Sequence, residues 1–237
     1  MERVPHHDRT RVALVTGASQ GLGRALAGAL ADRGWALVLD ARRADRLEQA
    51  AAELEGRTRV VAVPGDVADP AHRARLVAAV HDLGRLDLLV NNASTLGASP
   101  LPALDAIDLG VLRRTFEVNA VAPLALIQAL LDPLRDAHGT VLDITSDAAV
   151  EAYPGWGGYG SSKAAFEHLS AVLAVEQTDI RVLVADPGDM RTEMHQDAFP
   201  GEDISDRPPP EAIVPALVAL IESDRDGGRY RVPELVP

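Results

Sequence analysis

Tyr159 and Lys163 are the residues of this sequence whose types and spacing point most directly to chemistry. They lie four positions apart in GGYGSSKAAF, so a helix would place both side chains on one face. A free tyrosine has a pKa of about 10 and is a poor proton donor or acceptor at neutral pH. A neighbouring ammonium stabilises the phenolate and lowers that pKa toward the working range. The pair therefore predicts acid–base chemistry, although an incidental helical pair would show the same spacing.

The composition of the chain singles out Lys163 a second time. It is the only lysine among 23 Lys and Arg residues, and asparagine occurs only at Asn91, Asn92 and Asn119. We interpret this as a mutational or codon bias against Lys and Asn, a hypothesis that the codon usage of the parent genome would test. Lysine rather than arginine is favoured where a compact charge with rotatable donors must also contact a cofactor. A lysine or asparagine retained under such a bias is therefore a candidate for a chemical role.

Short runs rich in Val and Leu alternate along the chain with stretches that have helical spacing. Their near-continuous apolarity is typical of strands covered on both faces, as in a parallel sheet. We expect strands at 11–17, 36–40, 59–63, 86–92, 139–146, 180–186 and 229–234, and helices at 22–33, 44–55, 70–83, about 105–136, 160–177 and 211–223. This alternation predicts an α/β fold, a doubly wound Rossmann-type sheet of about seven parallel strands with helices on both faces. No break in composition marks a second domain, so we expect one domain over 1–237, with a flexible terminus at 1–10.

Three glycines follow the first expected strand, at Gly17, Gly21 and Gly23 in VTGASQGLGRALA. Glycines there let the backbone turn sharply and bring amide N–H groups and a helix N-terminus against a pyrophosphate. Their spacing differs from the common G-x-G-x-x-G fingerprint, and a tight structural turn is the alternative. Their place between the first strand and the first helix favours dinucleotide binding.

The end of the second expected strand, LVLDARR, bears on which dinucleotide would bind. An acidic side chain such as Asp40 would accept the ribose 2′-hydroxyl of NAD, whereas an arginine such as Arg42 would pair with the 2′-phosphate of NADP. Arg42 lies just past the strand end, where a long side chain can extend to the 2′-phosphate, and Arg43 adds a second positive charge. We therefore expect NADP, with NAD as the alternative.

With these residues in view, the sequence closely resembles the short-chain dehydrogenase/reductase family in its short single-domain branch, from about residue 11 to 192. The matching residues are Thr16, Gly17, Gly21 and Gly23 of the T-G-x-x-x-G-x-G loop, Asp66 with Val67, NNAS at 91–94, Asn119, Ser146, Tyr159 with Lys163, and PGDMRT at 187–192. All three asparagines and the only lysine fall on these motif positions. Such agreement is not a coincidence of composition.

The resemblance implies hydride transfer between a nicotinamide and a carbonyl or alcohol carbon, with Asn119, Ser146, Tyr159 and Lys163 as the catalytic residues. Tyr159 would donate the proton in the reductive direction, Ser146 would orient the carbonyl oxygen, and Lys163 would lower the Tyr159 pKa and bind the nicotinamide ribose. Asn119 would hold a water that links Lys163 to solvent. The cofactor-binding residues it implies are Thr16, Gly17, Ser19, Gly21, Leu22, Gly23, Arg42, Asp66, Val67, Asn92, Ala93, Tyr159, Lys163, Pro187, Gly188, Met190 and Thr192.

The sequence departs from the family pattern at three positions. Ser94 replaces a glycine, Gln20 stands where NADP-preferring members often carry a basic residue, and Asp147 follows Ser146. We expect Asp147 to face solvent; facing the pocket, it would disfavour anionic substrates. The expected function is an NADP(H)-dependent oxidoreductase that interconverts a ketone or aldehyde and an alcohol. The alternatives are an NAD-linked alcohol dehydrogenase and a non-catalytic nucleotide-sensing regulator.

Charge and segment composition limit the partners. A net charge of −12 argues against nucleic acid and anionic membranes, and the absence of cysteine fits a reducing, cytoplasmic compartment. No window is apolar enough for a membrane span, there is no secretory signal, and scattered histidines predict no catalytic metal. The polar, Pro-rich segment 188–210 is expected to be a substrate lid, with a plain surface loop as the alternative. Apolar helices at 105–136 and 160–177 suit a homodimer or homotetramer, as is common in the family, with a monomer as the alternative.

Overall fold

The computed structural model describes residues 10–235 and contains a seven-stranded sheet in which neighbouring strands are all parallel. The spatial order is β3-β2-β1-β4-β5-β6-β7, so the order reverses between β1 and β4. The strands are β1 (Val12–Val15), β2 (Ala36–Ala41), β3 (Val60–Pro64), β4 (Leu88–Asn91), β5 (Thr140–Ile144), β6 (Arg181–Asp186) and β7 (Gly228–Arg231). The predicted fold class is confirmed. The segment 1–10 that we expected to be flexible lies, except for residue 10, outside the described residues.

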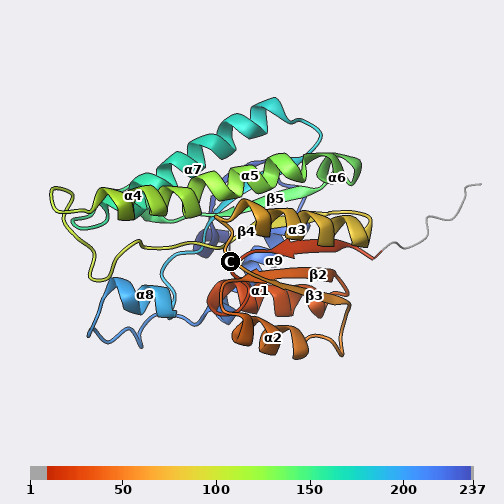
Figure 1. The fold of residues 1–237 in the computed structure, drawn as a ribbon, viewed down its shortest axis with the longest axis horizontal. Coiled ribbons are helices and arrows are strands. Elements are labelled where there is room, and N and C mark those ends of the chain that lie inside the picture. Colours follow the sequence, from red (N-terminus) through yellow and green to blue (C-terminus); the bar gives the residue numbers. More distant parts are fainter. Residues whose placement is uncertain (1–9, 236–237) are drawn as a thin grey trace, which may run out of the picture.

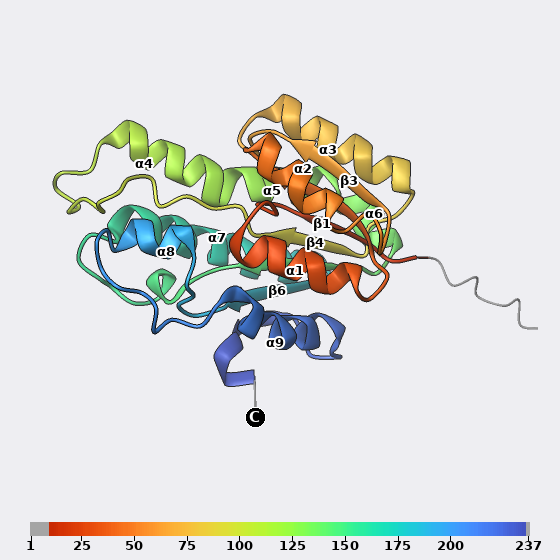
Figure 2. The same ribbon diagram turned by 90° about the horizontal axis from the view of Figure 1, so that it is seen from below.

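Helices cover both faces of the sheet, as Figures 1 and 2 show. The helices α1 (Gly21–Ala31), α2 (Ala44–Ala52) and α9 (Pro210–Glu222) pack on one face, and α3 (Pro70–Leu83), α5 (Ala122–Ala129) and α7 (Gly157–Glu176) pack on the other. Successive residues of β1 alternate between the two cores: Ala13 and Val15 pack with the first set, and Val12 and Leu14 with the second. Burial on both faces is the reason why these strands read as continuous apolar runs.

The stretch that we predicted as one helix over about 105–136 is divided, so that prediction is wrong in its continuity. It forms α4 (Leu109–Phe116), a π-helical turn η1 (Glu117–Val121), α5 and α6 (Leu131–Asp136). In a regular α-helix the N–H of residue 123 would bond the carbonyl of Asn119, but Pro123 has no N–H. The backbone therefore widens at the turn that carries Asn119.

The expected lid segment 188–210 contains a short helix that the sequence did not predict, α8 (Glu193–Ala198). Thr192 caps it, because the Thr192 hydroxyl accepts a 3.1 Å hydrogen bond from the His195 N–H. Figure 2 shows α8 away from the sheet, beside the start of α7. Two 3₁₀ turns, η2 (Asp147–Ala149) and η3 (Val232–Leu235), complete the elements. Of the helices in residues 10–235, none has the length and apolarity needed to cross a membrane.

Candidate active site

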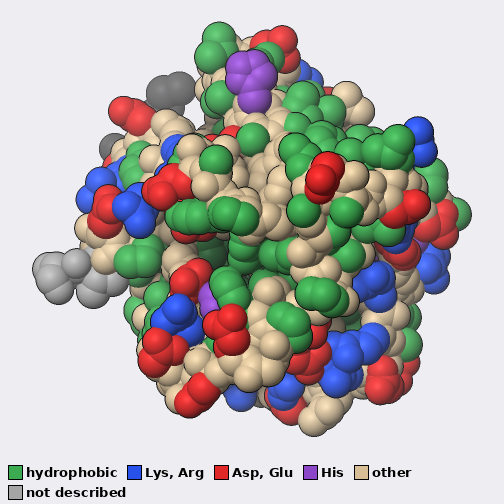
Figure 3. Space-filling view, turned by 90° about the vertical axis from the view of Figure 1, so that its left-hand side faces the viewer, with side chains coloured by type: hydrophobic (Ala, Val, Ile, Leu, Met, Phe, Trp, Pro, Cys, Tyr) green, Lys and Arg blue, Asp and Glu red, His purple; other side chains and the backbone are tan. Residues whose placement is uncertain are grey.

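A cavity of ≈ 1060 Å³ lies where the strands end, and residues that follow β1 to β6 line it. Figure 3 shows a hollow in this region of the surface, bordered by apolar side chains with acidic side chains close by. Met190, Met194 and Phe199 of segment 188–210 line the cavity, as do Tyr153 and Trp156 from the loop before α7. The carboxyl edge of a parallel sheet, near the point where the strand order reverses, is the usual ligand site in such folds.

Thr16 and Asn92 join the first loop to the end of β4. The Thr16 hydroxyl accepts hydrogen bonds of 3.0 Å from the N–H groups of Asn92 and Ala93. In return, the Asn92 amide donates to the carbonyls of Thr16 (2.8 Å) and Gly17 (3.2 Å). These bonds hold the glycine-rich loop in place without occupying the cavity side of its backbone.

The first loop has the features that a dinucleotide phosphate requires. Gly17 and Gly21 have φ values of +67° and +53°, a left-handed conformation that favours glycine. Gln20, the residue before α1, makes no side-chain capping bond, so no side chain covers the first N–H groups of that helix. A helix N-terminus of this kind binds phosphate well. The residues of this loop therefore fit the phosphates of a dinucleotide.

Gly23→Ala is expected to weaken dinucleotide binding by about tenfold or more, because the loop that carries the phosphate site would have to shift. A Cβ at Gly23 would lie 2.4 Å from the Gly17 carbonyl oxygen and 2.5 Å from the Asn92 amide nitrogen. Gly28→Ala is the matched control in the same helix, since a Cβ there meets nothing within 4 Å, and it should raise stability by about 0.5–1 kcal/mol. Fluorescence titration with NADPH and thermal unfolding would measure both effects. Equal affinity in the two variants would contradict the assignment of the loop.

Asp40 and Arg42, the two residues that bear on a preference for NAD or NADP, have different environments at the end of β2. The Asp40 side chain is fully buried, and His72 bonds one carboxylate oxygen at 2.6 Å. Burial raises the Asp40 pKa, while the His72 bond opposes that shift. Both residues line the cavity, but Arg42 is exposed whereas Asp40 is not. A ribose hydroxyl could reach Asp40 only after its cover moved, whereas a phosphate could reach Arg42 directly.

Tyr159 and Lys163 lie on consecutive turns of α7 and are both buried, with 7% and 2% of their surface exposed. The Lys163 ammonium donates a 2.8 Å hydrogen bond to the carbonyl of Ile144 at the end of β5 and lies 5.8 Å from the centre of the Tyr159 ring. Ser146 lies two residues after Ile144, in the turn that follows β5. Ser146, Tyr159 and Lys163 thus line one cavity with the glycine-rich loop.

The Tyr159 hydroxyl is a weaker acid than we predicted. Burial raises its pKa to about 12, and the charges of Asp147 and Asp186 add to the rise, while the bonds from Ser94 and Ser146 oppose it. Burial also lowers the pKa of Lys163, to about 8. Burial thus dominates the Tyr159 pKa in this structure, and the lowering effect that we expect from Lys163 stays a prediction. Tyr159 is therefore protonated at neutral pH, the form that a proton donor needs.

Asn119 is buried and does not line the cavity. Its amide nitrogen donates to the Thr95 carbonyl and the Ser162 hydroxyl, both at 2.9 Å. Its amide oxygen accepts from the Thr95 N–H (2.9 Å) and from Ser94 (3.1 Å). Ser94, the residue that stands in place of a glycine, thus donates to Asn119 and also lines the cavity.

The structure brings nearly all of the predicted site residues together. The cavity is lined by Gly17, Ser19, Gly21, Leu22, Arg42, Asp66, Val67, Asn92, Ala93, Ser146, Tyr159, Lys163, Pro187, Gly188, Met190 and Thr192. Thr16, Gly23 and Asn119 lie behind this lining. Asp147 also lines the cavity, so our expectation that it faces solvent is wrong. The turn η2 directs its side chain back to the Ser146 hydroxyl at 2.9 Å.

Two polar features near the cavity were not predicted. Asp143 of β5 is fully buried, accepts bonds from Ser170 (2.6 Å) and Asn91 (2.8 Å), and has a pKa raised by burial to about 6. Its charge raises the pKa of Lys163 and partly offsets the burial of the ammonium. Glu193 of α8 pairs with Arg43 (2.9 Å) and Arg46 (2.6 Å) across the chain. An aspartate inside the apolar run VLDITS was the only signal for the first, and the sequence held none for the second.

Comparison with known proteins identifies the family. The model of the family described as short chain dehydrogenase matches residues 11–203. The chain belongs to the short-chain dehydrogenase family. Sepiapterin reductase of the mouse (Mus musculus) is 36% identical over 199 residues, which are 78% of this chain and 76% of that protein. This short-chain dehydrogenase is therefore an oxidoreductase.

Solved structures of short-chain dehydrogenases agree with the fold. An alcohol dehydrogenase from the archaeon Thermococcus sibiricus, in complex with 5-hydroxy-NADP, has a TM-score of 0.85 and 30% identity, covering 94% of this chain and 95% of that one. A short-chain dehydrogenase from Shigella flexneri, in complex with NADP, has a TM-score of 0.88 and 30% identity, covering 95% and 99%. These likenesses support a nicotinamide cofactor for this chain.

Proposed function

We propose that this short-chain dehydrogenase is an NADPH-dependent carbonyl reductase that converts a ketone or aldehyde into an alcohol. The observation that carries the proposal is the position of Tyr159. Its buried, protonated hydroxyl lies in one cavity with the glycine-rich loop and with Ser146. A proton donor is thus held next to a dinucleotide site, which is what carbonyl reduction requires.

The residues of this chain would divide the work as follows. When bound, the nicotinamide supplies the hydride that goes to the carbonyl carbon. Tyr159 donates its proton to the carbonyl oxygen, and Ser146 hydrogen-bonds and orients that oxygen. Lys163 contacts the ribose hydroxyls and provides the positive charge that the Tyr159 phenolate needs after it has lost its proton. Asn119, behind the cavity, would hold a water that returns protons from solvent.

A carbonyl panel tests this proposal. Purified protein, NADPH and a set of aldehydes, acyclic ketones and cyclic ketones would be followed by the loss of NADPH absorbance. We expect turnover of at least one carbonyl class. NADPH binding without oxidation by any member of the panel would favour the nucleotide-sensing regulator, an alternative that the intact site residues do not support.

Arg42→Ala is expected to weaken NADPH binding by about tenfold or more while NADH binding changes little, because only NADPH carries the 2′-phosphate. Fluorescence titration of both cofactors would measure the change. Arg57→Ala is the matched control, since Arg57 is exposed, pairs with Asp32 and does not line the cavity. An unchanged NADPH preference in Arg42→Ala would remove the argument from Arg42, whereas a wild-type preference for NADH would favour the NAD-linked alternative.

Three further properties remain predictions of this proposal. Segment 188–210 would act as the substrate lid of a single-domain enzyme, and its cavity-lining Met194 and Phe199 support that role. Homo-oligomerisation is supported by exposed apolar side chains at the start of α4 and along α7: Leu109, Val172 and Val175. A cytoplasmic location is proposed from the composition alone.

A further inference from the structure

The carboxylate of Asp147 lies beside the hydroxyl that would meet a substrate carbonyl. Asp147 directly follows Ser146, and the Ser146 hydroxyl donates to Asp147 Oδ1 at 2.9 Å. The Ala148 N–H bonds the same carboxylate oxygen at 2.8 Å and fixes its orientation. Asp147 is half-buried and lines the cavity. A full negative charge is thus held one hydrogen bond from the position of the reacting carbonyl.

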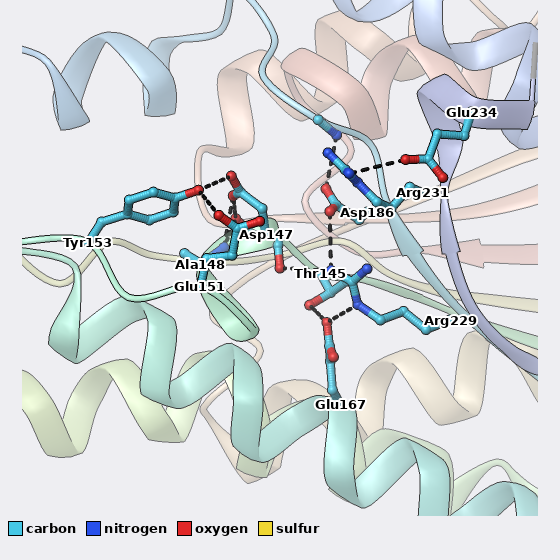
Figure 4. A network of polar contacts seen from close by, with 12 residues as sticks. Thr145, Asp147, Ala148, Glu151, Tyr153, Glu167, Asp186, Arg229, Arg231 and Glu234 are labelled. Atoms are coloured by element: carbon cyan, nitrogen blue, oxygen red, sulfur yellow. Dashed lines mark hydrogen bonds and ion pairs between the residues drawn. The ribbon is translucent and has the colours of Figure 1, made fainter.

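No cation in residues 10–235 neutralises this carboxylate by an ion pair. Its second oxygen accepts a 3.1 Å bond from the Tyr153 hydroxyl, which also lies 2.9 Å from a carboxylate oxygen of Glu151 (Figure 4). Glu151, too, forms no ion pair within the described part of the chain. The Tyr153 hydroxyl has one proton and can satisfy only one of the two carboxylates at a time. The rim of the cavity therefore carries unmatched negative charge.

Arg229 and Lys163, two cations of this region, are already matched by other carboxylates. Arg229 reaches the Ser146 carbonyl at 3.3 Å, but it pairs with Glu167 at 3.0 Å and with Asp186 at 3.2 Å (Figure 4). The negative charges of Asp143 and Glu167 both raise the pKa of Lys163 and so stabilise its ammonium. Neither cation is left to balance Asp147, so a positively charged group of a substrate would meet no competitor for it.

The bond between Ser146 and Asp147 has a consequence for the reaction. A serine hydroxyl has one proton, so while Ser146 donates to Asp147 it cannot donate to a carbonyl oxygen. A substrate N–H group that bonds Asp147 would replace Ser146 as the donor. The Ser146 proton would then be free for the carbonyl oxygen, where it stabilises developing negative charge.

A second part of the cavity lining is aromatic. The Trp156 ring lies 5.6 Å from the Tyr159 ring and 5.9 Å from the Phe199 ring, measured between centroids, and all three side chains line the cavity. Aromatic faces pack well against an apolar ring, and they attract cations through their π-electrons. An aryl or alkyl carbonyl compound that also bears an amine would be complementary to both parts of the lining.

We propose that the cavity selects carbonyl substrates that carry an N–H donor, above all a protonated amine, on the carbon next to the carbonyl, and that Asp147 is the residue that recognises it. This inference rests on the proposed carbonyl reductase function. The hydride of the reduced nicotinamide goes to the carbonyl carbon, the Tyr159 proton goes to the oxygen, and the amine leaves unchanged in the amino-alcohol product. Carbonyl compounds with a carboxylate at the same position are repelled.

Three phenyl ketones of similar size test the inference on the wild-type enzyme: 2-(methylamino)acetophenone, propiophenone and phenylglyoxylate, with NADPH saturating. We expect kcat/KM for the amine to exceed that for propiophenone by roughly tenfold to a hundredfold, the worth of one hydrogen bond to a charged group. Phenylglyoxylate should be the poorest of the three. Because Ser146 is released only by the N–H donor, part of the advantage should lie in kcat and not only in KM.

Asp147→Asn should reduce the ratio of kcat/KM for the amine to kcat/KM for propiophenone by about tenfold or more. It should raise the ratio of kcat/KM for phenylglyoxylate to that for propiophenone. Glu151→Gln is the matched control: it neutralises a carboxylate of the same hydrogen-bonded group that does not line the cavity, and it should change the first ratio far less. A wild-type preference for propiophenone or phenylglyoxylate, or an unchanged ratio in Asp147→Asn, would overturn the inference alone. If no carbonyl compound of any class consumes NADPH, the proposed function itself is overturned.

Discussion

Tyr159→Phe is expected to lower kcat for carbonyl reduction by roughly a thousandfold, the middle of the range that one positioned proton donor contributes. Phenylalanine keeps the ring that packs 5.6 Å from Trp156 and removes only the hydroxyl. Because the pKa of that hydroxyl is raised to about 12, it is protonated at neutral pH in the wild type. The mutant therefore loses the proton that the carbonyl oxygen receives. NADPH binding should change little, since the phosphate site and Arg42 are intact.

Stopped-flow or steady-state loss of NADPH absorbance would measure the first effect, and fluorescence titration the second. Tyr230→Phe is the matched control, because the Tyr230 hydroxyl bonds the Asp226 carbonyl at 2.7 Å and the residue does not line the cavity. That variant should retain wild-type turnover. Full activity of Tyr159→Phe across the carbonyl panel would show that the proton comes from another group.

The fold could be predicted from the sequence because its signals are local. A run such as LVLD indicates burial on both faces of a strand, and Gly17 and Gly21 indicate a turn that only glycine makes easily. The divided helix at 105–136 shows the limit of periodicity. Pro123 was visible, but proline is also common in the first turn of a new helix, so its effect on the Asn119 turn depended on the neighbouring structure.

The candidate site was predictable as a set of motif positions, but its electrostatics were not. The Tyr159 pKa depends on how completely the ring is buried, and spacing in the sequence does not report burial. Glu193 and Arg46 are 147 positions apart, and only the tertiary structure brings them into contact. The orientation of Asp147 follows from the 3₁₀ turn after β5, where one turn of backbone decides between solvent and cavity. The sequence thus predicted which residues form the site, but it did not predict where their side chains point or whether they are charged.

Proton transfer in this site depends on two buried groups with opposite shifts. Burial disfavours the charged form of each, which raises the pKa of Tyr159 and lowers that of Lys163 to about 8. Lys163 therefore loses its ammonium as the pH rises through about 8, and contacts that need the cation are lost above that pH. Tyr159 stays protonated over the same range. The reduction rate of the wild type should accordingly decline on the alkaline side because of Lys163, and not because of Tyr159.

Lys163→Arg is expected to lower kcat/KM by about a hundredfold although the positive charge is kept, the size of effect that a misplacement of about 1 Å produces. The lysine is 2% exposed, and its ammonium bonds the Ile144 carbonyl at 2.8 Å in a space shaped for a compact head group. A planar guanidinium is larger and cannot repeat that geometry.

The pH dependence separates loss of geometry from loss of charge in this variant. Arginine stays protonated at all working pH values, so the decline that we expect for the wild type above about pH 8 should be absent from Lys163→Arg. Activity profiles from pH 6 to 10 and thermal unfolding would test this, with the exposed Arg24→Lys as the reverse exchange outside the site. Wild-type turnover in Lys163→Arg would mean that any cation suffices beside Tyr159. A chain that uses arginine at every other basic position would then have kept its one lysine for a reason unrelated to this chemistry.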